Sequence, residues 1–129
     1  MKPTNKGFSL MELVVVVTII AILMTLAYPS YINFIRKAHR SDAALELLDW
    51  ANRQQIWRAD HTTYNANINP GNTEHYTFAI SNMTATTYTL TATPQWAQAN
   101  DKEDGVACSS LTLDEDGTQG PSGKLVCWE

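Results

Sequence analysis

Residues that commonly carry chemistry are scarce in this chain of 129 residues. It has two cysteines, three histidines, and 9 Lys and Arg residues against 13 Asp and Glu residues. The net charge of −4 is the wrong sign for a broad nucleic-acid-binding surface, which is usually basic. The sequence has no Ser/His/Asp order, no phosphate-binding glycine loop and no pair of acids whose spacing argues for catalysis. These absences indicate a protein that is not an enzyme, and no catalytic residue is predicted.

Metal and cofactor sites are also not expected. His39 lies among basic residues and is expected to be solvated, whereas His61 and His75 have no nearby cysteine with which to bind zinc. Acidic residues gather at positions 101–104 and 114–116, and acidic loops can bind Ca²⁺, but the calcium-loop order D-x-[DN]-x-[DN]-G is absent. We therefore predict no cofactor, with calcium as the one alternative that these loops leave open.

Charge is absent altogether from residues 13–35, and residues 13–27 are almost wholly aliphatic. An α-helix rises about 1.5 Å per residue, so about 20 apolar residues cross the hydrocarbon layer of a membrane. A chain this short cannot supply apolar neighbours on every side of such a helix. The segment is therefore predicted to span a membrane.

Glu12 stands at the start of this apolar segment. A carboxylate inside an apolar helix costs about 2.5–3.5 kcal/mol even on lenient insertion scales. Either Glu12 reaches water at the membrane edge, or it pairs with a cation, and the chain has no basic residue between Lys6 and Arg36. A cut after Gly7 would create an α-amine on Phe8, four residues before Glu12. That amine could neutralise the acid within one helix or between neighbouring copies.

The segment KGFSLMEL at positions 6–13, the aliphatic run and the following Ala27-Tyr28-Pro29 together resemble the class III signal of type IV pilins. The resemblance implies that a prepilin peptidase cuts between Gly7 and Phe8 and methylates Phe8. It also implies that Glu12 is the acid that docks subunits and that the apolar helix becomes the assembly core. The implied partners are other pilin and minor pilin subunits, the prepilin peptidase, the inner-membrane pilus assembly machinery and membrane lipid.

The helix is expected to continue beyond the apolar run. Pro29 predicts a bend or local break near residues 26–28, because proline lacks a backbone donor. From residue 41 the pattern becomes amphipathic, with Ala43, Leu47, Trp50 and Trp57 on one face that should contact a sheet. The helix would end near residue 59.

Three basic residues follow the apolar run: Arg36, Lys37 and Arg40. They balance the basic residues before the run, so charge counting does not set the orientation, and a cytoplasmic leader follows from the resemblance alone. We expect these side chains to meet lipid phosphates or acids of neighbouring subunits. Binding to DNA is an alternative that we do not favour.

The remainder predicts a small antiparallel sheet. Residues 75–81 and 86–93 alternate with period 2 and are joined as a hairpin across 82–85. Shorter strands are expected at 110–113 and 124–128, and loops at 61–74 and 95–106. The predicted fold class is α+β, in which a long N-terminal helix packs against an antiparallel sheet of about four strands, as the resemblance to pilins also implies.

Cys108 and Cys127 are the only cysteines. An even pair in a small extracytoplasmic domain predicts one disulfide, closing a loop of about 20 residues. The sequence around them resembles small minor pilins, in which two cysteines bracket a variable terminal region.

The predicted organisation is a leader at 1–7, a transmembrane and assembly helix at 8–35, and a helix continuation with a periplasmic β domain at 36–129. The protein is expected as a single-pass inner-membrane precursor and then in a pilus at the cell surface. The predicted function is that of a minor pilin in pilus assembly or priming, and hence in adhesion, twitching motility or DNA uptake. Two alternatives stay open, namely a pseudopilin of a type II secretion system and a membrane-anchored extracytoplasmic binding module that keeps residues 1–7.

Overall fold

The computed structural model describes Met1 and residues 6–129, which divide into two compact units, Met1–Phe34 and Ile35–Glu129. The predicted leader lies partly outside the described residues, at positions 2–5. The described residues form, in chain order, one long helix, six strands and two short 3₁₀ helices: α1 (Leu10–Asp60), β1 (Tyr76–Ser81), β2 (Thr89–Pro94), η1 (Trp96–Asn100), β3 (Lys102–Glu103), β4 (Val106–Ala107), β5 (Leu111–Asp114), β6 (Gln119–Gly120) and η2 (Leu125–Trp128).

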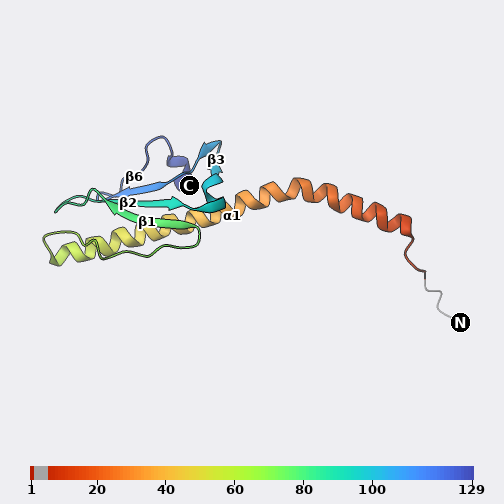
Figure 1. Ribbon diagram of the computed structural model, residues 1–129, viewed down its shortest axis with the longest axis horizontal. Helices are drawn as coiled ribbons and strands as arrows, with labels where there is room; N and C mark the ends of the chain where they lie inside the picture. The colour runs from red at the N-terminus through yellow and green to blue at the C-terminus, as the bar shows by residue number, and fades with distance from the viewer. Residues whose placement is uncertain (2–5) are drawn as a thin grey trace. The chain divides into compact units, whose positions relative to one another are not determined.

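Helix α1 has 51 residues and is continuous through Pro29 (Figure 1). The prediction near residues 26–28 is a bend or a local break, and the local break is absent because the helix is uninterrupted there. Pro29 removes only the hydrogen bond that its missing N–H would give to the carbonyl of Thr25, and the turns on both sides are intact. The helix ends at Asp60, one residue beyond the expected end.

None of the described apolar side chains of the first unit is buried. Every described side chain from residue 6 to residue 31 is exposed, including the aliphatic residues of the uncharged run. By length and composition, α1 is able to cross a membrane. Its apolar surface has no counterpart within its own unit, so it requires lipid or other chains to cover it.

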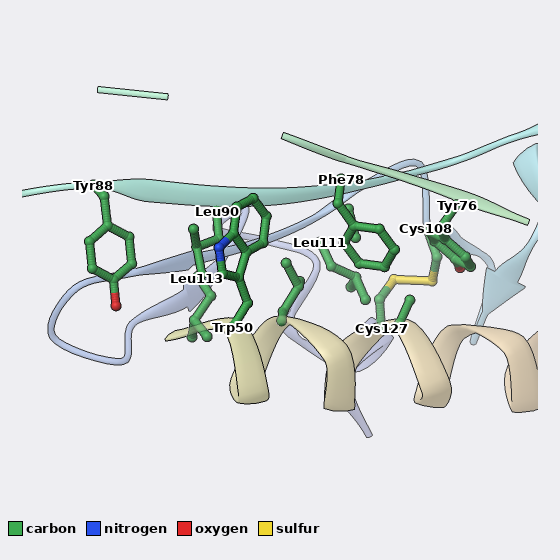
Figure 2. Close-up of a cluster of buried hydrophobic side chains, with 12 residues drawn as sticks. Trp50, Tyr76, Phe78, Tyr88, Leu90, Cys108, Leu111, Leu113 and Cys127 are labelled. Carbon is green, nitrogen blue, oxygen red and sulfur yellow. A yellow bond between two sulfur atoms is a disulfide. The ribbon is translucent and has the colours of Figure 1, made fainter. Parts of the chain in front are cut away.

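The second unit places residues 35–60 of α1 against a four-stranded antiparallel sheet of order β1-β2-β5-β6 (Figure 1). Register sets Phe78 opposite Ala92 and Leu90 opposite Leu113, and all four side chains are buried. Figure 2 shows Trp50 rising from α1 toward Leu90 and Leu113. The two longest strands and the hairpin between them lie close to their predicted positions.

Alternation along the strands separates a dry face from a wetter one. The threonines at 77, 89, 91 and 112 are half-exposed, while their neighbours point into the core. A sheet covered on one face by a single helix has this pattern. The predicted fold class is confirmed.

The fourth strand is not where the sequence predicts it. Residues 125–128 form the 3₁₀ helix η2, and the fourth strand is β6, which pairs with β5 through Thr112 and Gly120. The segment expected as a loop at 95–106 holds η1 and most of the two-stranded hairpin formed by β3 and β4. Strands of two residues are too short to show an alternating pattern, which is why the sequence does not reveal them.

The disulfide between Cys108 and Cys127 is present, with a sequence separation of 19. Both cysteines are buried in the core (Figure 2). The bond therefore ties η2 to the segment that precedes β5.

Candidate functional site

The N-terminal motif lies at the start of α1. Gly7 and Phe8 precede the helix, which begins at Leu10, and Leu13 donates its backbone N–H to the carbonyl of Ser9 at 3.1 Å. Phe8 is 76% exposed. The Gly7–Phe8 peptide bond is thus in an exposed, non-helical segment, the kind of backbone that a protease can reach.

Glu12 lies in the first turn of α1. A carboxylate at this end of a helix is stabilised by the helix dipole, by about 0.3–1 kcal/mol. That is a fraction of the cost of placing the acid in hydrocarbon, so the dipole alone does not account for it. No ion pair within the part of the chain that the structure describes includes Glu12.

Other polar side chains of the apolar run are satisfied within the helix itself. The hydroxyl of Thr18 donates to the carbonyl of Val14 at 2.7 Å, and that of Thr25 donates to the carbonyl of Ile22 at 2.7 Å. These hydroxyls need no partner from another chain. Glu12 differs from them because no ion pair among the described residues neutralises its charge.

In the second unit, a partly buried ion-pair network joins α1 to the segment that follows η1. Arg40 bonds to both Asp101 and Glu103, and Lys37 Nζ lies 3.2 Å from Glu103 Oε1. The side chains of Arg40 and Asp101 are 2% and 1% exposed. The expectation that Lys37 and Arg40 face lipid or neighbouring subunits is therefore corrected, since acids of the same chain bind them.

The network shifts the pKa values of Arg40 and Glu103. Burial alone lowers the pKa of Arg40, but its hydrogen bonds to Asp101 and Glu103 outweigh burial and raise the pKa above its ordinary value. The hydrogen bond from Arg40 lowers the pKa of Glu103. Asp101 and Glu103 thus serve as partners of Arg40, and the described residues contain no cluster of three or more potential metal ligands.

Gln98 connects η1 to α1 and to β1 through hydrogen bonds of its side chain. Its amide nitrogen donates to the carbonyl of Arg36 at 2.9 Å and to the hydroxyl of Tyr76 at 3.1 Å. Burial raises the pKa of Tyr76 to about 12, so its hydroxyl stays protonated. His39 lies 3.3 Å from the oxygen of Gln98 and stacks on His75 with ring centroids 3.7 Å apart. The expectation that His39 is solvated is wrong, because the fold brings these residues together.

The sequence also missed the two polar residues of the buried face of α1. The buried positions are 40, 43, 47, 50 and 54, so Arg40 and Gln54 extend the apolar stripe by one step at each end. Their spacing of three and four residues from the stripe was the available signal. Gln54 forms two hydrogen bonds with the backbone of Asn65, at 2.7 and 3.0 Å, whereas Trp57 is half-exposed and stacks on His61.

These features define a class of protein. An exposed apolar half-helix, a motif for cleavage before it and an antiparallel sheet on the other half are the architecture of type IV pilins. A type IV pilin of Shewanella oneidensis has 23% sequence identity and a TM-score of 0.59, over 73% of this chain and 98% of that one. The non-core minor pilin PilV of Neisseria meningitidis has 24% identity and a TM-score of 0.56, over 70% and 90% of the two chains. Both share the fold.

The family follows from the sequence match. Residues 29–112 match the family described as "Type IV minor pilin ComP, DNA uptake sequence receptor", and residues 2–28 match the prokaryotic N-terminal methylation motif. The chain belongs to this family of type IV minor pilins. These matches confirm the resemblance to type IV pilins that the N-terminal motif indicated. They also confirm the expectation of a membrane-anchored precursor whose mature form belongs to a pilus.

Curated relatives match mainly over short segments. The type IV major pilin protein PilA of Myxococcus xanthus is 44% identical over 45 residues, which are 35% of this chain and 20% of that protein. The prepilin peptidase-dependent protein D of Escherichia coli is 36% identical over 57 residues, which are 44% of this chain and 39% of that protein. The chain thus spans between a fifth and two fifths of the length of these relatives.

Proposed function

We propose that this minor pilin is cut after Gly7, methylated on Phe8 and built into a type IV pilus, where it serves in assembly or priming. Its partners would be other pilins, the prepilin peptidase and the inner-membrane assembly machinery. The periplasmic side of the membrane would hold the second unit before assembly.

A single observation carries the proposal: Glu12 lies in the first turn of a helix whose apolar side chains are exposed on every face up to residue 31. The apolar surface favours packing against other such helices, and Glu12 requires a positive partner once it leaves water. The new amine of Phe8 supplies that partner, in the same copy or in the next. Cleavage and assembly are thereby linked, because the amine exists only after the leader has been removed.

The test compares Glu12→Gln with Thr18→Val in the full chain, expressed in a host with its assembly machinery. Glu12→Gln removes the charge and keeps the shape, whereas Thr18→Val removes a hydroxyl that is already bonded within its own helix. We expect both variants to be cleaved and methylated. Glu12→Gln should lose at least tenfold of its incorporation into sheared pili, and Thr18→Val should assemble normally.

Intact mass of the mature protein reports cleavage and methylation, and immunoblotting of sheared pili reports incorporation. Normal incorporation of Glu12→Gln would refute the pairing of acid and amine. An uncut Met1 terminus in the functional protein would instead favour a membrane-anchored binding module. Loss of protein secretion without loss of pili in a deletion strain would favour a pseudopilin.

Recognition of duplex DNA is a second candidate, and the family description favours it. The charges disfavour it, since residues 36–129 hold 7 basic against 12 acidic side chains. Arg40 and Lys37 are also bound to acids of their own chain. Fluorescence anisotropy with a labelled duplex at 50 and 200 mM salt tests this role. A binding constant that falls steeply with salt would support it, and no binding at 50 mM would remove it.

A further inference from the structure

Trp96 is the most exposed large hydrophobic side chain of the second unit, with 82% of its surface accessible. Its backbone has a φ of +52°, a region that bulky L-residues seldom adopt. Residues held in sparsely populated backbone regions cluster at functional sites, including those that bind another molecule. Folding of this chain alone gives no apolar cover for the indole.

The segment that carries Trp96 is firmly held on both sides. The backbone N–H of Gln95 donates to the carbonyl of His75 at 2.8 Å, and Gln98 bonds to the carbonyl of Arg36 and to Tyr76. Asp101, just after η1, is bound to Arg40. Trp96 is therefore presented by a rigid segment that is tied to α1 at Arg36.

Arg36 is the first charged residue after the uncharged run 13–35. That run of 23 residues is about 34 Å long as a helix, compared with about 30 Å of hydrocarbon and about 40–45 Å including the headgroups. When the run is centred in a bilayer, Arg36 falls in the headgroup layer. The hydrogen bond from Gln98 to the carbonyl of Arg36 holds η1 next to this residue.

The charged residues of the second unit are also unevenly distributed between the segments near Arg36 and the rest of the unit. Residues 36–40 and 101–104 hold four basic and three acidic side chains, which gives +1. The rest of residues 36–129 holds three basic and nine acidic side chains, which gives −6. An anionic membrane surface attracts the first group and repels the second, which orients the unit.

We propose that Trp96 is the centre of a membrane-contact site, to which Arg36 and the exposed Lys102 of the same unit add positive charge, and that this site binds the headgroup layer of an anionic bilayer in the unassembled subunit. Tryptophan suits this layer because its indole has an apolar body and a polar N–H. The spanning helix keeps the site at the membrane, so one aromatic side chain suffices for a contact that would be too weak in a free protein. The site would hold the second unit on the membrane until the helix leaves the lipid.

The experiment uses the full chain in nanodiscs of phosphatidylcholine and phosphatidylglycerol whose acyl chains carry bromine near the headgroup. Brominated lipid quenches tryptophan that it contacts. We expect Trp96→Phe to lose more than half of the lipid-dependent quenching of the wild type. Trp57→Phe is the matched control, because Trp57 lies 21 residues, about 31 Å, beyond Arg36 along α1. It should keep the wild-type quenching.

Equal quenching in the wild type and in Trp96→Phe would overturn the proposal. It would also be overturned if Trp96 stayed open to aqueous iodide in nanodiscs and became protected only in lipid-free sheared pili or on addition of duplex DNA. Neither result depends on Glu12, so the assembly function is tested separately.

Discussion

Replacement of Arg40 tests the ion-pair network, in which a helix residue binds an acid 61 positions away. Arg40→Met keeps most of the side-chain volume and removes the charge. Asp101 is 1% exposed and would be left as a buried, uncompensated carboxylate. Glu103 is 22% exposed and still has Lys37, so it can regain part of its hydration.

The cost therefore arises mainly at Asp101. Removal of one partner of a buried pair destabilises a protein by about 3–5 kcal/mol. Asp101→Asn in the Arg40→Met background removes the stranded charge and should recover part of that loss. The matched surface control is Arg53→Ala, because the Arg53–Asp49 pair has side chains that are 56% and 49% exposed. Its loss should cost less than about 0.5 kcal/mol.

Urea unfolding of the full chain in a mild detergent, followed by the tryptophan fluorescence of the second unit, which includes buried Trp50, measures these free energies. The pH dependence supplies a second readout. The folded pKa of Glu103 is lowered, so its contribution is present above the unfolded pKa, near 4.5, and is lost as the pH falls through the folded pKa. Arg40→Met should flatten that acid dependence. A loss no larger than that of Arg53→Ala, with an unchanged pH profile, would refute the reasoning.

Two further changes test the C-terminal part of the sheet. Cys127→Ser removes the bond to Cys108, and the free energy of unfolding should fall by about 3 kcal/mol, which is the loop entropy of about 20 residues; an unchanged urea midpoint under oxidising conditions would contradict this. In Gly120→Ala the new Cβ would lie 2.5 Å from the hydroxyl of Thr112, which should cost about 1 kcal/mol. Thr112→Ala in that background should restore most of the loss, and a double variant as unstable as the sum of the two single variants would show that this contact is not the cause.

The sequence was most informative where structure is set by local periodicity. The alternation of Tyr76 and Phe78 predicts β1, and the spacing of Ala43, Leu47 and Trp50 predicts the face of α1 that contacts the sheet. Apolar burial enforces these patterns, because a shift by one residue would expose the core side of a strand. The motif around Glu12 was also readable, since its order is contiguous in the chain.

Features that depend on distant pairs were not predictable. Arg40 reads as one more surface cation, and only the folded chain brings it to Asp101. Likewise, β6 consists of Gln119 and Gly120, which carry no apolar signal and pair with β5 because Gly120 admits the hydroxyl of Thr112. The positive φ of Trp96 also has no signal in the sequence, because bulky L-residues seldom adopt it.

The polar residues at the two ends of the buried stripe also fix how α1 lies on the sheet. Ala43, Leu47 and Trp50 alone would allow the helix to slide by one turn and still bury apolar surface. Such a slide would strand Arg40 away from Asp101 and would break the two bonds between Gln54 and Asn65. Buried polar groups without partners are costly, so both ends oppose the slide. The sheet of the second unit therefore has one register relative to residues 35–60 of α1.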